Sequence, residues 1–161
     1  MEKISLNQVQ EFLRIKKIAV VGFSRNPKDF SRTLSADLVK HGYEIIPINY
    51  NSTEIAGEKC YANISAADKA IDGILVFTKK DAGKVIDEAI TKGIKQIWLR
   101  NMFTPAKELE EIQKKCATNG INFISGYCPY MFLDDKKFPH NFHKFFTKLS
   151  GNFPKADGTL T

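Results

Sequence analysis

The apolar positions along the chain follow two alternating periods. Short unbroken apolar runs, typical of strands buried on both faces, lie at 18–22, 43–48, 73–77, 95–99 and 121–125. Between these runs, apolar residues recur at helical spacing, as in Ala82, Val85, Ile86, Ala89 and Ile90. The pattern predicts an α/β fold, a doubly wound parallel sheet of five strands with helices on both faces.

Glycines mark the junctions between the expected helices and strands. Gly42, Gly93 and Gly120 each follow a helical segment and directly precede a strand. A glycine in this place adopts the left-handed conformation that ends many helices. The same junction occurs at all of these positions, which supports a regular alternation of helix and strand.

We expect the strands, numbered along the chain, to lie in the order 3-2-1-4-5. In such sheets, ligands bind beyond the carboxyl ends of the strands, where the winding reverses. The expected order puts that point between the first and fourth strands. It would bring together the 22–31 loop and Arg100, with Asn49 and Thr78 beside them.

The two ends of the chain carry helical patterns of their own. Ser5 and Gln8 have the spacing of a capping box, which predicts a short leading helix. Segment 138–151 has an apolar stripe at helical spacing that we expect to dock on the domain, on a second copy or on another partner. A basic amphipathic helix could also touch a membrane, so an interaction protein that uses this helix is an alternative function. The stripe consists of Phe142, Phe145, Phe146 and Leu149. We therefore expect one domain over 1–151 and a loose tail over 152–161.

Composition narrows the classes of function. The chain has 161 residues, 43% of them hydrophobic, and no apolar run long enough to cross a membrane. With no apolar signal core at its N-terminus, we expect a cytoplasmic protein. The net charge of +6 is spread along the chain, which favours a phosphorylated small molecule over nucleic acid. Three distant cysteines without a CxxC pair indicate neither a disulfide framework nor a zinc site.

The loop after the first strand has the chemistry of a phosphate site. Gly22 permits a tight turn, and the following helix would direct its positive end toward an anion. Arg25 and Lys28 add charge, and Ser24 and Ser31 add hydroxyl donors. The alternative, an ordinary solvated loop, remains open on residue types alone.

A standard dinucleotide site is disfavoured. The fingerprint G-x-G-x-x-G needs glycines where this chain has Ser24 and Pro27. The second strand ends at Asn49, without the acidic residue that holds a ribose diol. An NADP-type enzyme remains an alternative, because Arg25 could bind the additional phosphate.

Four stretches together resemble a known family. They are 22–27 with 30–33, 41–49, 57–61 and 93–99. The chain resembles the small bacterial CoA-binding domain proteins, which are similar to the N-terminal domain of the succinyl-CoA synthetase α-subunit. The resemblance covers about residues 12–130.

This resemblance implies a Rossmann-like fold that binds coenzyme A or an acyl-CoA, as a non-catalytic or regulatory module. It implies phosphate contacts from Gly22, Phe23, Ser24, Arg25, Lys28 and Ser31. It places Pro47, Ile48 and Asn49 beside the adenosine, and Thr78 and Lys79 along the cleft. Arg100 departs from the family pattern and would alter the floor of the cleft.

The remaining reactive residues form no clear catalytic group. His140 and His143 have a spacing that suits two metal ligands, but no third ligand lies nearby in the sequence. Cys128 follows the fifth strand and could form a mixed disulfide with the thiol of CoA. It could equally be a small buried residue. We therefore assign no catalytic or metal-binding residue.

Overall fold

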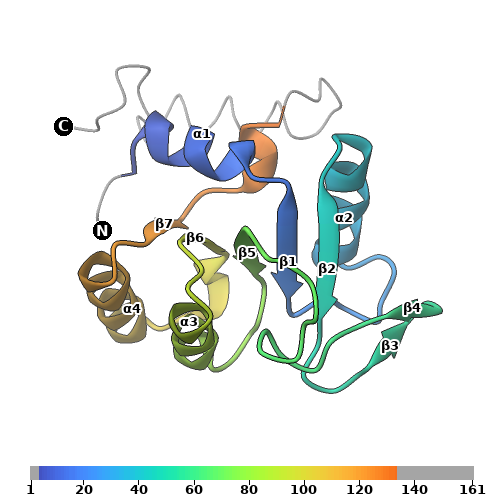
Figure 1. Cartoon of the computed structure of the whole chain (residues 1–161). Helices are drawn as coiled ribbons and strands as arrows, with labels where there is room; N and C mark the ends of the chain where they lie inside the picture. Colours follow the sequence, from blue (N-terminus) through green and yellow to red (C-terminus); the bar gives the residue numbers. More distant parts are fainter. Residues whose placement is uncertain (1–3, 134–161) are drawn as a thin grey trace.

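The computed structural model describes residues 4–133, in which strands and helices alternate (Figure 1). The helices are α1 (Leu6–Arg14), α2 (Phe30–Lys40), α3 (Ala82–Thr91) and α4 (Ala106–Thr118), with short 3₁₀ helices η1 (Asn101–Phe103) and η2 (Pro129–Met131). The strands are β1 (Lys17–Val21), β2 (Glu44–Ile48), β3 (Glu54–Ile55), β4 (Glu58–Lys59), β5 (Gly73–Val76), β6 (Gln96–Leu99) and β7 (Asn122–Ser125). The predicted runs correspond to β1, β2, β5, β6 and β7.

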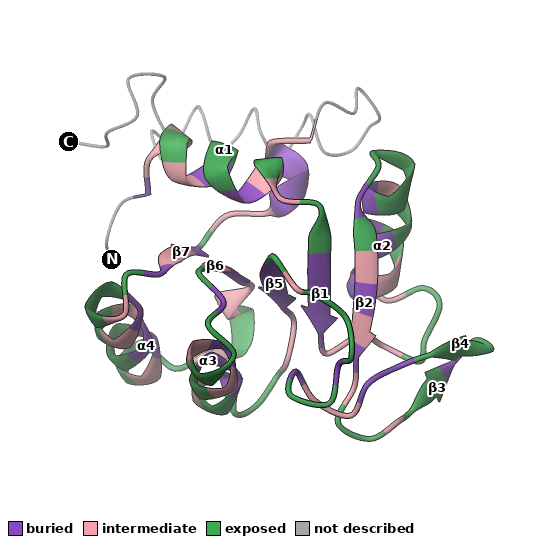
Figure 2. Ribbon diagram, in the orientation of Figure 1, coloured by how far each residue is buried: buried purple, intermediate pink, exposed green. Residues whose placement is uncertain are grey.

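These strands form one parallel sheet in the order β2-β1-β5-β6-β7. Helices α1 and α2 pack on one face, where Phe12 and Leu34 belong to the same core as Trp98 of β6. Helices α3 and α4 pack on the other face, where Ile86 and Ile112 join the core (Figures 1 and 2). The predicted doubly wound, Rossmann-like α/β fold is confirmed.

The predicted strand order 3-2-1-4-5 is wrong. The third strand of the prediction, β5, lies directly beside β1, and β2 lies at the edge of the sheet. Pro47 explains why β2 has this position. Its carbonyl faces away from β1 and accepts a hydrogen bond from the Tyr61 N–H at 2.9 Å, but proline has no N–H to offer a further strand. The winding therefore reverses between β1 and β5.

Local interactions explain where the first and third helices begin. The predicted capping box of α1 is present, because Ser5 and Gln8 bond reciprocally to each other's backbone N–H. Helix α3 has no cap of this kind from the side chain of the residue before it. Asp81 precedes the helix at φ +58° and makes no capping bond; Glu108 of α4 instead accepts from the Gly83 N–H at 3.2 Å.

Two expectations concern the ends of the chain. Among residues 4–133, no helix is both long and apolar enough to cross a membrane. The predicted helix over 138–151 and the predicted loose tail over 152–161 lie outside the described residues, as do His140 and His143.

Gly22 is held where β1 comes closest to the end of β5. Its φ is +87°, and a Cβ built on it would lie 2.9 Å from the backbone carbon of Phe77 and 2.9 Å from the nitrogen of Thr78. Both atoms are main chain and cannot move aside as a side chain could. Only glycine therefore fits this position without shifting β1 or β5.

Gly22→Ala should destabilise the protein more than Gly42→Ala. Gly42 has a matching φ of +86° but nothing within 4 Å of its built Cβ, so its substitution carries only the conformational penalty of about 1–2 kcal/mol. Gly22→Ala adds steric overlap of about 1–3 kcal/mol. Urea unfolding of both variants measures the difference, and equal losses of stability would contradict the close approach.

Candidate functional site

A cavity of about 350 Å³ lies beyond the carboxyl ends of the strands, at the β1/β5 reversal. Loops after β1, β2, β5 and β6 line it. The lining residues are Gly22, Ser24, Arg25, Asp29, Asn49, Tyr50, Asn51, Phe77, Thr78, Lys79, Arg100 and Phe103. The fold thus has a hollow where parallel α/β proteins bind their ligands.

Most of the predicted site residues come together in this cavity. Those that line it are Gly22, Ser24, Arg25, Asn49, Thr78, Lys79 and Arg100. They come from four different connections, so only the fold brings them into one place. The error in the predicted strand order does not separate these residues. All the loops that carry them leave the carboxyl edge of the sheet, whichever strands are neighbours.

Two predicted residues are buried and act through internal bonds. The side chains of Ser31 and Ile48 are fully buried. The Ile48 carbonyl accepts hydrogen bonds from the N–H groups of Gly22 and Phe23, each at 3.0 Å. These N–H groups therefore hold the loop against β2.

Three more predicted residues lie outside the cavity lining. Phe23 packs beneath Arg32, whose guanidinium carbon is 5.0 Å from the ring centroid. Pro47 lines a separate hollow on the outer edge of β2. Lys28 is exposed on the loop, and its N–H donates to the Asn26 side chain.

The protein's own carboxylate occupies the start of α2. Asp29 caps the helix by accepting from the Ser31 N–H at 2.9 Å and from the Ser31 hydroxyl at 2.7 Å. The Ser31 hydroxyl oxygen in turn accepts from the Ser24 N–H at 3.0 Å. A helix N-terminus attracts anions, and here an internal anion already takes that place. The loop backbone is thus largely committed to the fold.

Cationic side chains outnumber carboxylates in the part of the cavity lining that the structure describes. Arg25, Lys79 and Arg100 line it, with Asp29 as the one described carboxylate. The Arg100 guanidinium carbon lies 4.5 Å from the centre of the Phe30 ring, which orients it from below. This excess of positive charge favours a ligand with several negative charges.

Aromatic side chains flank these cations, and sequence reasoning missed them. Tyr50 and Phe103 line the cavity and are 43% and 53% exposed, which is unusual for large rings. The Lys79 ammonium lies 5.7 Å from the centre of the Phe103 ring. The sequence signal that could have identified Tyr50 and Phe103 was their position shortly after β2 and β6. Residues that follow parallel strands lie at the carboxyl edge of the sheet, where ligands bind.

A second hollow of about 400 Å³ continues from the first toward α3. The two share Tyr50, Asn51 and Thr78. The Tyr50 hydroxyl donates a hydrogen bond to Glu88 of α3 at 3.3 Å. The Tyr50 side chain therefore lies at the junction of the two hollows. The carboxyl edge therefore offers an elongated surface that suits a long ligand.

Cys128 lies after β7 and is half-buried in the core beneath α1 and α2. Burial raises the pKa of its thiol, and the positive charge of Arg100 only partly opposes this. Because the thiolate is the reactive form, a raised pKa makes the thiol a poor partner for exchange. The geometry supports a packing role over a redox role.

The fold and the cavity define a Rossmann-like protein with a cavity at the carboxyl edge of its sheet, lined by Arg25, Lys79 and Arg100. The CoA binding domain family matches residues 16–134, so the chain belongs to that family. The resemblance seen in the sequence is thereby confirmed, and membership indicates a CoA-type ligand.

Individual proteins are also similar to the chain. The uncharacterized protein YneT of Bacillus subtilis (strain 168) is 37% identical over 82 residues, 50% of this chain and 61% of that protein, so less than two thirds of its length is matched. A conserved hypothetical protein of Pyrococcus furiosus is 34% identical, with a TM-score of 0.60 over 71% of this chain and 96% of that one. The dinucleotide-forming acetyl-coenzyme A synthetase 1 of Ca. Korarchaeum cryptofilum, solved with phosphate and ADP, has a TM-score of 0.58 at 22% identity over 70% of this chain and 26% of that one. At that identity the likeness concerns the fold alone.

Native Cys128 should react slowly with iodoacetamide at pH 8. Its raised pKa leaves little thiolate, so we expect alkylation at least about tenfold slower than in the unfolded chain. Peptide mass spectrometry measures the extent of alkylation at each cysteine separately. Cys116, whose burial raises its pKa to about 12, is the internal reference for an unreactive thiol. A native Cys128 rate equal to the unfolded rate would restore the redox role.

Proposed function

We propose that the protein binds coenzyme A or an acyl-CoA at the carboxyl edge of its sheet, as a non-catalytic or regulatory module. One observation carries the proposal: Arg25, Lys79 and Arg100 line one cavity at the strand reversal of a chain that belongs to the CoA binding domain family. The cytoplasmic location and the binding rather than catalytic role stay predictions.

In this proposal the phosphates contact cationic side chains more than loop backbone. Coenzyme A carries a diphosphate and a separate phosphate on its ribose, and charge-assisted bonds to arginine are the strong kind. Arg25 is exposed and free to adjust, whereas Arg100 is half-buried and oriented by Phe30. Since the N–H groups of Gly22 and Phe23 bond to Ile48, the loop serves mainly to position Arg25.

The base is proposed to stack on the exposed rings at the mouth of the cavity. Tyr50 and Phe103 offer aromatic faces there, and a base stacked on such a ring gains about 1–3 kcal/mol. This revises the expected adenosine contacts. Ile48 has no exposed side-chain surface, and Pro47 lines a different hollow.

The NADP-type alternative has weaker support. Dinucleotide sites hold a ribose with a side chain at the end of the second strand, where this chain has Asn49. Both ends of the Asn49 amide are used internally: its nitrogen donates to the Phe23 carbonyl at 2.8 Å, and its oxygen accepts from the Asn51 N–H at 2.8 Å. A titration panel of CoA, dephospho-CoA, ADP and NADP separates the two functions.

Arg25→Ala should weaken CoA binding about tenfold, because one charge-assisted hydrogen bond contributes about 1.5–3 kcal/mol. Lys28→Ala is the matched control. It removes the same charge from the same loop, at a residue outside the cavity lining, and should change the Kd less than about twofold. Isothermal titration calorimetry measures both. Equal effects would mean that the site depends on net charge alone, and absence of CoA binding by the unmodified protein would end the proposal.

Asp29→Asn should strengthen CoA binding several-fold. Asparagine keeps an oxygen that can accept from the Ser31 N–H, while about 1 kcal/mol of repulsion against the phosphates disappears. The gain should shrink as salt is raised, because screening weakens the repulsion in the unmodified protein. Titrations at low and high salt test this, and weaker binding at low salt would place the phosphates away from Asp29.

A further inference from the structure

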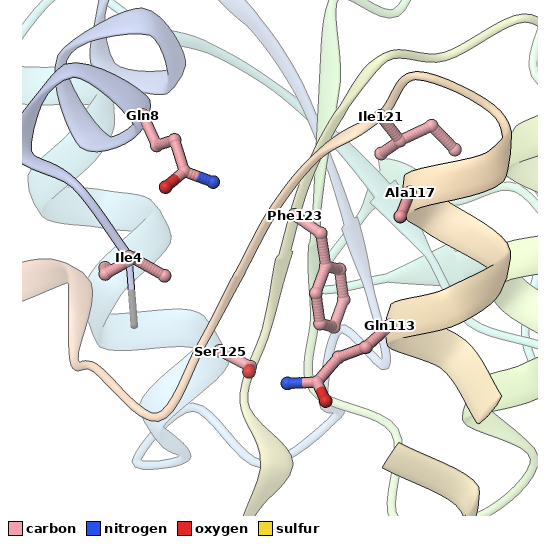
Figure 3. Close-up of a pocket in the computed structure, with 7 residues that line it drawn as sticks. All are labelled: Ile4, Gln8, Gln113, Ala117, Ile121, Phe123 and Ser125. Carbon is pink, nitrogen blue, oxygen red and sulfur yellow. The ribbon is translucent and has the colours of Figure 1, made fainter. Parts of the chain in front are cut away.

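A second surface lies along β7, which is the edge strand on the opposite side of the sheet from β2. In the part of the chain that the structure describes, β7 pairs with β6 alone. A groove of about 220 Å³ follows it, with Ile4 and Gln8 on one side and Gln113 and Ala117 on the other (Figure 3). Unprotected edge strands can pair with other chains, and proteins usually cover them.

The backbone of β7 faces this groove. The Asn122 N–H donates to the Lys95 carbonyl at 2.8 Å, toward β6. Because successive residues of a strand alternate in direction, the N–H groups of Phe123 and Ser125 face the open edge. Both of these residues line the groove.

Among residues 4–133, no charged side chain lines the groove. Its lining consists of Ile4, Gln8, Gln113, Ala117, Ile121, Phe123 and Ser125. Three other cavities of the described chain contain charged residues: Arg100 in the ligand cavity, Lys84 in the hollow beside α3 and Lys69 at the outer edge of β2. Because the chain has 26% charged residues, this mixture of apolar, amide and hydroxyl groups suits an occupant whose contacting face carries no charge.

We propose that segment 138–151 of the same chain occupies this groove through its apolar stripe. The stripe consists of Phe142, Phe145, Phe146 and Leu149. The family match ends at residue 134, so this segment is an addition to the family domain. Its apolar residues can be buried only against other apolar groups, and Ile4, Ile121 and Phe123 offer such groups in the groove.

The connection is long enough to reach. The described chain ends at Leu133, which packs in the same core as Ile4 of the groove. Residues 134–141 can span up to about 28 Å when extended. A domain of this size has a radius of gyration of about 14 Å. The connection is therefore long enough for the stripe to reach the groove.

Hydrogen exchange of the full chain tests the proposal. The double variant Phe142→Asp/Phe146→Asp should speed exchange of the Phe123 and Ser125 amides at least about tenfold. Its matched control, Lys144→Ser/Lys148→Ser, changes the opposite side of the same predicted helix and should leave that exchange unchanged. Unchanged exchange in the aspartate variant, or equal changes in both variants, would overturn the proposal.

The reciprocal variant alters the groove. Ala117 is exposed on α4, so Ala117→Arg keeps a good helix former and should fold normally. It should speed trypsin cleavage within 138–151 while leaving the CoA affinity and the monomer mass by light scattering unchanged. Unchanged cleavage would overturn the proposal, as would a dimer in the unmodified protein that Ala117→Arg dissociates, because a second copy would then be the occupant. The CoA affinity of each variant is measured in a separate titration. A failure of tail docking can therefore be distinguished from a failure of CoA binding.

Discussion

The site depends on the close approach of Gly22 to the backbone between Phe77 and Thr78. This contact holds the end of β1 against the end of β5, at the point where the chain reverses its direction of winding. The loops after β1 and β5 must then diverge to opposite faces of the sheet. The cavity is the space that this divergence leaves, so the fold and the candidate ligand site have one common cause.

A general feature of the fold is modified in this chain. The start of the helix after β1 is usually available to an anion, but here Asp29 caps it through Ser31. The loop gains a rigid internal network and gives up part of its own anion-binding capacity. Arg25, Lys79 and Arg100 supply positive charge around it. Recognition by side chains makes the site more dependent on individual residues than recognition by backbone would be.

The sequence predicted the elements of the fold well because their causes are local. Apolar periods and helix-ending glycines act within a few residues, and each of the five main strands appeared where expected. Strand order depends on contacts between distant segments, and the one local signal for it was overlooked: Pro47 restricts β2 to an edge.

The distinction between local signals and contacts of distant segments also applies to the candidate site. Arg25, Thr78 and Arg100 could be predicted because each lies within the first four residues after a strand. The capping of α2 by Asp29 is a local signal that was overlooked, whereas the exposure of the Phe103 ring at the cavity depends on three-dimensional packing. Sequence reasoning therefore identified most of the residues that line the cavity and missed its exposed rings.

A crystal structure of the protein with bound coenzyme A tests the account most directly. We expect the diphosphate within hydrogen-bond distance of Arg25, Lys79 or Arg100, with the base against Tyr50 or Phe103. A ligand bound away from the carboxyl edge, or an empty cavity in crystals grown at saturating CoA, would contradict it.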